Sequence, residues 1–243
     1  MNVKQWFMLV SMAVGILGSP FSVAGDVEDK ISERLSSAVP GLEILSIRES
    51  EAKGLYEIQA ASGETVYTTQ DGQYLLTGDL LKVTSTGIAN VTIEAKAAAR
   101  HKALTGFGKS GVISYKADDE RAVVSVFTDI DCPYCRKLHG EVPKLNDYGI
   151  TVNYYAFPRS QPGSPSFVKY VSVWCAEDQQ SAMNAAKAGK TVPAATCDNP
   201  VLKQYELGQR VGVTGTPAIV LEDGNIVPGY VPANKLAEGL GLL

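Results

Sequence analysis

The chain of 243 residues is long enough for one large domain or two small ones, and 45% of its residues are hydrophobic, as in ordinary globular proteins. Its net charge is −4 and its isoelectric point is near 5.3. A nucleic-acid-binding protein usually carries a basic surface, so this composition argues against nucleic acid as a partner. The chain has two histidines and four cysteines, so few side chains are available for metal binding or redox chemistry.

Residues 1–24 have the three parts of a signal peptide. Lys4 supplies the positive charge, and residues 6–17 form an apolar run of about twelve residues, too short to cross a bilayer as a helix. Ser22 and Ala24 place small side chains where a signal peptidase reads them. We therefore expect cleavage after Ala24 and an exported, soluble mature protein, with a retained membrane anchor as the alternative. Export would place the chain where disulfides persist.

Residues 25–87 are expected to form a small α+β domain without a catalytic cluster. Apolar residues between Val27 and Leu35 recur at helical spacing. Strands are expected over residues 42–47, 55–60, 64–69, 73–77 and 80–83. Asp71-Gly72 predicts a hairpin turn, because both residue types tolerate positive φ. We expect this domain to serve interaction, since an apolar edge strand favours pairing with another chain.

Residues 88–106 are expected to form a linker helix between two domains. The segment Glu94–Arg100 is rich in alanine, which has the highest helix propensity. Asn90 can cap the start of this helix and Gly106 can end it. The sixteen residues from Asn90 to Thr105 would span about 24 Å as a helix. His101 lies on it, and we interpret His101 as a solvated surface residue.

The second domain, residues 107–243, contains a C-x-x-C pair between a strand and a helix. Residues 122–127 are apolar and β-branched, which is typical of a buried strand, and residues 136–142 are expected to be helical. Cys132 would then lie at the helix N-terminus, where free backbone N–H groups and the helix dipole stabilise a thiolate and lower the thiol pKa. We expect Cys132 to be the exposed nucleophile and Cys135 the resolving cysteine.

Two alternatives to redox chemistry are a zinc site and a purely structural disulfide at this pair. A zinc site needs two further ligands with suitable spacing. The remaining candidates, which form no close pair in the sequence, are Cys175, Cys197, His101 and His139. The redox interpretation is favoured, and we expect no metal and no cofactor.

The charged and histidine residues near the pair are expected to have structural roles. Carboxylates close to Cys132 would oppose thiolate formation. Asp131 is therefore expected to cap the helix and Asp129 to lie in the preceding loop. His139 follows Cys135 by four residues and could contact the site, but a partly buried or surface position is favoured.

The rest of the domain predicts alternating strands and helices. Strands are expected over residues 112–115, 150–157 and 226–228, and helices over residues 167–180, 181–187 and 202–210. Pro143 should kink or end the helix that follows the cysteines. Thr216-Pro217 directly precedes a strand, and this motif alone favours a trans proline. For Cys175 and Cys197, a structural disulfide closing a loop of about 22 residues, with a contribution of roughly 3 kcal/mol, is favoured over a second redox pair.

The element order, the C-x-x-C pair and the later Thr-Pro together resemble the thioredoxin fold. Over essentially the whole mature chain, the sequence also resembles the DsbC/DsbG family of bacterial periplasmic thiol:disulfide interchange proteins. The segments that carry this resemblance are Val126–Ile130, Lys137–His139, Ile150–Val152, Ala156–Arg159, Trp174–Ala176, Gly212–Leu221 and Val227–Tyr230. The resemblance implies a cystatin-like α+β dimerisation domain, a linker helix and an α/β thioredoxin-like catalytic domain with a helical insertion.

The resemblance also implies partners and residue roles. The family is periplasmic and forms a V-shaped homodimer through the N-terminal domains. Its substrates are misfolded exported proteins, a membrane thiol reductase of the DsbD type donates electrons, and no cofactor is used. Carried onto this chain, the implied roles are nucleophile for Cys132, resolving cysteine for Cys135, a substrate-facing wall with a cis proline for Thr216 and Pro217, and a structural disulfide for Cys175 and Cys197.

One departure from the family pattern concerns the residues between the cysteines. The usual isomerase dipeptide is Gly-Tyr, whereas Pro133-Tyr134 resembles the DsbG branch; the Cys175/Cys197 pair favours the DsbC branch. This dipeptide alters thiolate stability and reduction potential. We therefore expect a disulfide isomerase that reshuffles or reduces non-native disulfides. The alternatives are a DsbG-like reductase of sulfenic acids with chaperone activity, a chaperone whose thiols are secondary, and a dithiol oxidase.

Overall fold

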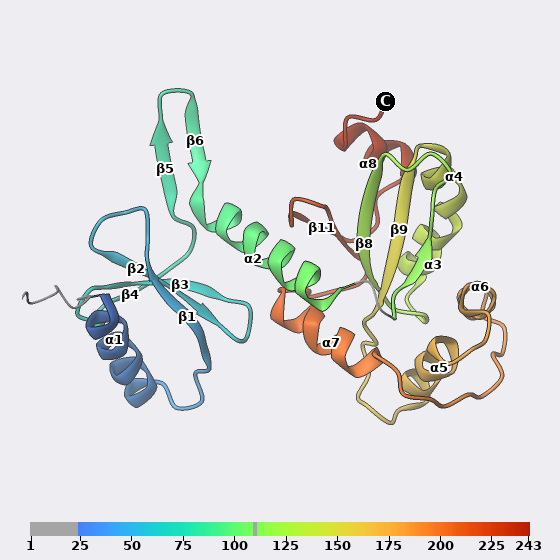
Figure 1. Cartoon of the computed structure of the whole chain (residues 1–243), viewed down its shortest axis with the longest axis horizontal. Coiled ribbons are helices and arrows are strands. Elements are labelled where there is room, and N and C mark those ends of the chain that lie inside the picture. The colour runs from blue at the N-terminus through green and yellow to red at the C-terminus, as the bar shows by residue number, and fades with distance from the viewer. Residues whose placement is uncertain (1–23, 109–110) are drawn as a thin grey trace, which may run out of the picture.

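The structure, a computed structural model, describes residues 24–108 and 111–243, which form two globular parts joined by helix α2 (Val91–Phe107) (Figure 1). The predicted signal peptide at residues 1–24 therefore falls almost entirely outside the described residues. Among the helices of the described residues, none has the length and apolar character needed to cross a membrane.

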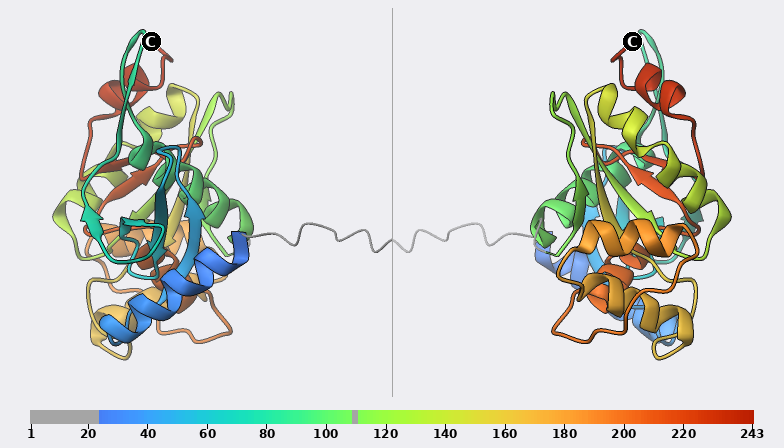
Figure 2. Two further views of the ribbon diagram at one scale, coloured as in Figure 1. Left: turned by 90° about the vertical axis from the view of Figure 1, so that its left-hand side faces the viewer. Right: turned by 90° about the vertical axis from the view of Figure 1, so that its right-hand side faces the viewer.

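In the N-terminal domain, one helix packs against a four-stranded antiparallel sheet. α1 (Ala24–Ala38) lies beside a sheet of strand order β1-β2-β3-β4, with bounds β1 Ile44–Glu49, β2 Leu55–Ala60, β3 Thr65–Thr69 and β4 Leu75–Thr77 (Figures 1 and 2). Val27, Ile31 and Leu35 of α1 are buried together with Ile58 of β2. Gly72, in the turn between β3 and β4, has a φ of +69°. The predicted helix, strands and hairpin turn of this domain are confirmed.

A separate two-stranded hairpin follows this sheet and projects away from it (Figure 1). It consists of β5 (Leu81–Thr84) and β6 (Gly87–Asn90). The strand expected over residues 80–83 is therefore confirmed, but assigning residues 88–90 to the linker helix was wrong. Residues 87–90 instead form β6, which pairs with β5. Asn90 is both the last residue of β6 and the N-cap residue of α2.

Helix α2 is fastened to both domains. At its start, the Asn90 side chain accepts a hydrogen bond from the Ile93 backbone N–H, as predicted, and the buried Thr92 hydroxyl bonds the Tyr67 hydroxyl at 2.6 Å. The helix continues past Gly106 and ends at Phe107, because the residue with the left-handed φ of +77° is Gly108. The predicted end at Gly106 is thus wrong by one residue.

The C-terminal half of α2 docks on the catalytic domain. Arg100 donates from Nε to the Val211 carbonyl at 2.9 Å, and the exposed His101 ring bonds the Glu222 carbonyl at 2.6 Å. A Cβ atom on Gly224 would lie 1.9 Å from the Ala97 carbonyl oxygen, so the two chain segments are in close backbone contact. The last turns of α2 are therefore packed against the second domain, so this helix is not a free spacer between the domains.

The catalytic domain is built on a mixed five-stranded sheet of order β11-β10-β8-β9-β7, in which β8 and β9 are parallel. The strands are β7 Ile113–Tyr115, β8 Ala122–Thr128, β9 Ile150–Ala156, β10 Ala218–Val220 and β11 Ile226–Pro228. The helices are α3 Pro133–Gly140, α4 Val142–Asp147, α5 Pro165–Trp174, α6 Gln179–Lys187, α7 Val201–Arg210 and α8 Ala233–Gly239. Helices cover both faces of the sheet (Figures 1 and 2). One hydrophobic core contains side chains of α3, α4, α5, α6 and α8, and a second contains those of α7 with α2 against it.

Two helix boundaries in this domain have simple physical causes. The helix after the cysteines ends at Gly140, and Pro143 lies in the first turn of α4, where a missing N–H costs nothing. This confirms the predicted break at Pro143. The helix expected over residues 167–180 is wrong in extent: α5 ends at Trp174, and Asp178 caps a new helix by accepting a hydrogen bond from the Ser181 N–H.

Gly208 in α7 offers a test of the packing between this helix and the sheet. A Cβ atom there would lie 2.5 Å from Cδ2 of Phe157 and 3.0 Å from Cδ1 of Phe127. Alanine normally stabilises a helix interior relative to glycine by about 1 kcal/mol, but overpacking a core costs about 1–3 kcal/mol. We expect Gly208→Ala to lower the free energy of unfolding by about 1–2 kcal/mol, measured in urea by the fluorescence of Trp174.

The matched control is Gly140→Ala, because a Cβ atom on Gly140 meets nothing within 4 Å. This variant should unfold at the wild-type urea concentration or slightly above it. Equal behaviour of the two variants would contradict the tight packing of α7 described above.

Candidate active site

The C-x-x-C pair lies where the buried strand β8 gives way to α3. Cys132 is the N-cap residue of α3, with extended backbone angles, and Pro133 occupies the first helical turn. The free N–H groups of that turn therefore face the Cys132 sulfur, as the sequence predicts. Cys132 is a free thiol, and so is Cys135 one turn further along the helix.

The predicted helix cap at Asp131 is wrong. The helix begins one residue later than such a cap requires, and the Asp131 carboxylate turns to α5, where Lys169 Nζ and Ser166 Oγ each donate to it at 2.9 Å. Asp129 lies in the loop, as predicted, and is buried. It accepts from the Asp131 N–H at 2.7 Å and from Arg159 Nε at 3.1 Å. Both carboxylates near Cys132 are thus neutralised by a cation from another segment.

Cys132 is buried rather than exposed, contrary to the sequence-based expectation: 2% of the residue is accessible. Its Sγ donates to the Thr216 backbone carbonyl at 3.3 Å, so the loop before β10 covers it. Burial alone would raise the pKa of Cys132, but the backbone N–H groups of Cys135 and Tyr134 and the side chains of Thr216 and Cys135 outweigh it and lower this pKa. The Cys132 thiolate is therefore stabilised from the helix and from the facing loop.

Cys135 has the opposite character. It is fully buried, and the Asp129 backbone N–H donates to its Sγ at 3.3 Å. Burial raises the pKa of Cys135 above the usual thiol value, against the opposing charge of Lys187. The two thiols of the pair therefore differ in acidity in the order that a nucleophile and a resolving cysteine require.

Thr216 and Pro217 lie against the pair from the loop before β10. The Thr216–Pro217 peptide bond is cis, which differs from the trans bond favoured by the motif alone and agrees with the resemblance. The Thr216 hydroxyl is buried and has no nitrogen or oxygen partner among the described residues. It offsets part of the rise that burial causes in the pKa of Cys132 and of Cys135.

Sequence reasoning missed Lys187, the last residue of α6. It is 4% exposed, and its Nζ donates to Thr128 Oγ1 at 2.6 Å and to the Asp129 carbonyl at 2.9 Å. Burial lowers the pKa of Lys187 to about 8. The signal that could have found it is helical spacing: Lys187 follows the buried Met183 by four residues and so shares its inward face.

His139 is partly buried, as the favoured prediction had it. Its Nδ1 bonds the Tyr154 hydroxyl at 3.1 Å and its Nε2 bonds Asn184 Oδ1 at 2.9 Å. Burial, together with the charge of Lys187, lowers the pKa of His139 to about 4. The imidazole is therefore neutral at physiological pH and holds α3 to β9 and α6.

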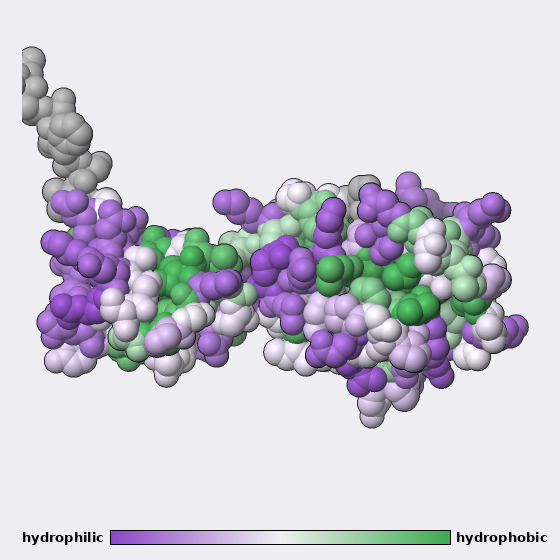
Figure 3. Space-filling view, turned by 90° about the horizontal axis from the view of Figure 1, so that it is seen from below, coloured by the Kyte–Doolittle hydropathy of each residue, from purple (hydrophilic) through white to green (hydrophobic). Residues whose placement is uncertain are grey.

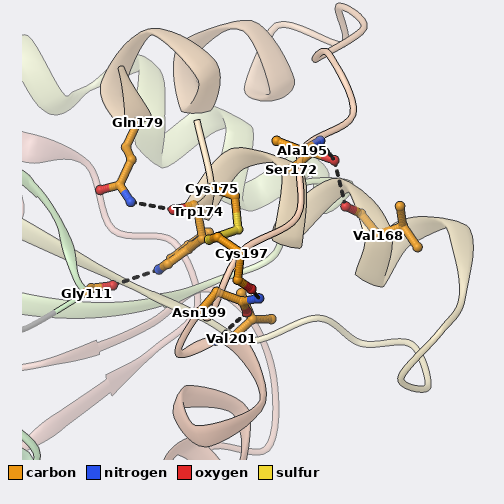
Figure 4. The surroundings of a disulfide bond; sticks show 10 residues. All are labelled: Gly111, Val168, Ser172, Trp174, Cys175, Gln179, Ala195, Cys197, Asn199 and Val201. Atoms are coloured by element: carbon orange, nitrogen blue, oxygen red, sulfur yellow. Dashed lines mark hydrogen bonds between the residues drawn. A yellow bond between two sulfur atoms is a disulfide. The ribbon is translucent and has the colours of Figure 1, made fainter. Parts of the chain in front are cut away.

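The other two cysteines, Cys175 and Cys197, form a disulfide with an S–S distance of 2.06 Å (Figure 4). Cys175 caps the end of α5, and Cys197 lies in the extended segment after α6. Beside the bond, Trp174 Nε1 donates to the Gly111 carbonyl at 2.7 Å, and the Ala195 N–H donates to Ser172 Oγ at 3.4 Å. The bond thus fastens an extended segment to the helix that packs next to the active site.

Comparison with known proteins agrees with this geometry. A model of the disulfide bond isomerase protein N-terminal domain matches residues 22–92, and a thioredoxin-like domain model matches residues 109–242. The thiol:disulfide interchange protein DsbC of Escherichia coli is 36% identical over 98% of this chain and 96% of its own length. The DsbC of Dickeya dadantii is 40% identical over 81% of this chain and 80% of its own length.

This chain belongs to the DsbC family of thiol:disulfide interchange proteins. It is therefore a thiol:disulfide oxidoreductase, and the predicted pairing of an N-terminal DsbC-type domain with a thioredoxin-like domain is confirmed. For the fold, a solved linker-deletion variant of ScsC from Proteus mirabilis superposes with a TM-score of 0.50 at 24% identity, covering 63% of this chain and 88% of that chain.

The neutral His139 of this DsbC-family site generates a prediction on pH. Above about pH 6.5, His139 is neutral in both the folded and the unfolded chain. Between pH 6.5 and about 4 only the unfolded chain binds the proton, so folding stability falls as the pH falls through this window. We expect a loss of about 3 kcal/mol from this residue. The measurement is the free energy of unfolding in urea at several pH values.

The test compares His139→Gln, whose amide can still bond Tyr154 and Asn184, with His101→Gln at the exposed histidine of α2. The first variant should lose less stability on acidification than the wild type, and the second should follow the wild type. Parallel pH curves for wild type and His139→Gln would contradict the prediction.

Proposed function

We propose that this DsbC-family protein is a periplasmic protein disulfide isomerase that reshuffles or reduces non-native disulfides in exported proteins. The observation that carries the proposal is the unequal pair of thiols. Cys132 has a lowered pKa at the N-terminus of α3, and Cys135 beneath it is fully buried with a raised pKa. Such a pair can attack a foreign disulfide and remain bound to it long enough for rearrangement.

The proposed reaction begins with the Cys132 thiolate. It attacks one sulfur of a substrate disulfide, forms a mixed disulfide and releases the other substrate sulfur as a thiolate, which takes up a proton. In isomerisation, a substrate thiolate then forms the correct bond and displaces Cys132 as a thiolate. In reduction, the Cys135 thiolate displaces the substrate, the Cys132–Cys135 disulfide forms, and a DsbD-like membrane thiol reductase restores the dithiol.

Thr216 and Pro217 are proposed to guide the substrate to Cys132. The Thr216 carbonyl already bonds the Cys132 sulfur, so a substrate segment lying on this loop would be within reach of the thiolate. Tyr134, 63% exposed, presents an aromatic surface beside the pair. Hydrophobic surface is also present on one face of both domains (Figure 3). Apolar surface of this kind suits the exposed side chains of a misfolded protein.

We further propose that two copies pair through their N-terminal domains. β4 is an edge strand of its sheet, and an edge strand offers unpaired N–H and C=O groups to a second chain. Exposed apolar side chains gather on β4 and on the β5–β6 hairpin: Leu75, Leu76, Leu81, Val83 and Ile88. Val83 is 84% exposed, which a soluble hairpin tolerates poorly unless a partner covers it.

The isomerase proposal predicts how a scrambled multi-disulfide enzyme recovers activity in glutathione buffer. Cys132→Ser should abolish the recovery, because no other free thiol in the described chain has a lowered pKa. Cys135→Ser should retain part of the isomerisation but lose net reduction, since the mixed disulfide then lacks a resolving thiol. Unchanged recovery with Cys132→Ser would refute the proposal.

The dimer proposal predicts the outcome of charged substitutions on the hairpin. The full mature chain carrying Val83→Asp and Ile88→Asp should sediment as a monomer at concentrations where the wild type is a dimer, because burying two carboxylates in an apolar interface is costly. Leu202→Asp, at an exposed apolar position of the catalytic domain, is the matched control and should remain dimeric. A dimeric hairpin variant would refute pairing through this surface.

The alternative function is a DsbG-like reductase of sulfenic acids with chaperone activity, and it rests on Pro133-Tyr134 between the cysteines. The matches to DsbC proteins do not favour it over isomerisation. A protein that fails to restore the scrambled enzyme, yet reduces a sulfenic acid on a single-cysteine protein, would support the alternative.

A further inference from the structure

Lys187 occupies a position beneath the active site that the exchange reaction described above leaves unused. It reaches from the end of α6 to the carboxyl end of β8, where its Nζ bonds Thr128 Oγ1 at 2.6 Å and the Asp129 carbonyl at 2.9 Å. The same short segment holds Cys135, because the Asp129 N–H donates to its Sγ at 3.3 Å. The ammonium group and the resolving sulfur are thus both held by the short segment Thr128–Asp129.

The charge on Lys187 is not neutralised by a carboxylate. Among residues 24–108 and 111–243, no carboxylate oxygen lies within ion-pairing distance of its Nζ. The Asp129 carboxylate is instead paired with Arg159, and the ring face of Tyr154 lies 5.7 Å from the ammonium. The other charged or titratable groups that face it are Cys132, Cys135, Arg136 and His139.

A buried ammonium without an ionic partner is costly for folding, and an apolar side chain of similar length would usually serve stability better. Burial accordingly lowers the pKa of Lys187 to about 8. The amine is still predominantly protonated at neutral pH. Its charge is among the causes that oppose the burial-driven rise in the pKa of Cys135. The folding cost and the location together indicate a role at the resolving thiol.

We propose that Lys187 is a positioning residue for the resolving step: through the Thr128 hydroxyl it places a positive charge against Cys135 and so sets how often a mixed disulfide ends in reduction rather than isomerisation. The inference rests on the proposed isomerase function and concerns the same site. It adds a residue of α6 to the site formed by the C-x-x-C segment and the loop before β10.

In the resolving step, Cys135 displaces the substrate sulfur from Cys132. The Cys135 thiol loses its proton to solvent, and the resulting thiolate is stabilised by the Thr128 hydroxyl, which Lys187 polarises. The thiolate attacks the Cys132 sulfur, the Cys132–Cys135 bond forms and the Cys132–substrate bond breaks. The substrate sulfur leaves with the electron pair and takes up a proton, so the active-site dithiol is oxidised and the substrate disulfide is reduced.

The first test measures how fast iodoacetamide alkylates Cys135 in Cys132→Ser protein at pH 7, where Lys187 is still charged. Adding Lys187→Met, which removes the charge and nearly keeps the length, should slow this alkylation about threefold, because a tenfold lower acidity of the thiol, the smaller end of the effect of an adjacent opposite charge, makes the thiolate scarcer but more nucleophilic. Lys190→Met is the matched control, because this exposed lysine lies three residues further on and its substitution removes the same net charge. It should leave the alkylation rate unchanged.

The second test uses the chain with both active-site cysteines. The equilibrium with glutathione at pH 7 should move by much less than tenfold in Lys187→Met, because Cys135, whose pKa is raised, is protonated in the dithiol of both proteins. Decay of a mixed disulfide between Cys132 and a peptide should slow about threefold, because a less acidic Cys135 thiol gives a thiolate that is scarcer but more nucleophilic. Neither readout needs isomerase activity, so failure here is distinguishable from failure of the proposed function.

A purely structural role for Lys187 would give a different result. Lys187→Met would then change the melting temperature but leave the alkylation of Cys135 at pH 7 and the decay of the mixed disulfide at their wild-type rates, and this outcome overturns the proposal. If Lys187→Met does not fold, Thr128→Val removes the connecting hydroxyl at nearly constant volume. It should shift both readouts in the same direction by a smaller factor; wild-type values in that variant overturn the proposal equally.

Discussion

The active site depends on one contact between two distant parts of the chain: the Cys132 sulfur lies against the Thr216 carbonyl, 84 residues away in sequence. On its own, a cysteine at a helix N-terminus would be an acidic but solvent-exposed thiol. The facing loop buries it, which raises the pKa, while the helix N–H groups together with the side chains of Thr216 and Cys135 lower the pKa by more. The balance requires β8 and β10 to be neighbours in the sheet, so the fold of the whole domain is a condition for the reactivity of one sulfur.

Local sequence patterns predicted most of the architecture and the two reactive cysteines. The alternation in β2 and β3, the helical spacing of Val27, Ile31 and Leu35, and the strand–CxxC–helix order are all readable within short windows. These features are local because they follow from backbone geometry and from which face of an element is apolar. The break between α3 and α4 could be predicted equally well, since a proline such as Pro143 is tolerated in the first turn of a helix but not in its interior.

The errors have a common cause in contacts between segments that are far apart in sequence. Asp131 looks like a helix cap until Lys169 and Ser166 of α5 are placed beside it. Cys132 looks exposed until the loop before β10 covers it. Lys187 looks like an ordinary helix-ending lysine, and its burial follows only from the docking of α6 beneath β8. In each case a partner that is distant in the sequence determines the charge environment or the accessibility of the side chain.

The disulfide between Cys175 and Cys197 has a consequence for how this enzyme must be recharged. In the proposed reaction, one pair of cysteines stays oxidised while another pair in the same domain is repeatedly returned to the dithiol state. Cys197 lies in an exposed segment, so burial does not hide its bond from reductants as it hides Cys135. In the proposed cycle, an electron donor that reduces the Cys132–Cys135 bond therefore has to distinguish the two bonds by the surface around each of them or by their reduction potentials. Fidelity of electron delivery in such a protein is a matter of molecular recognition as much as of redox potential.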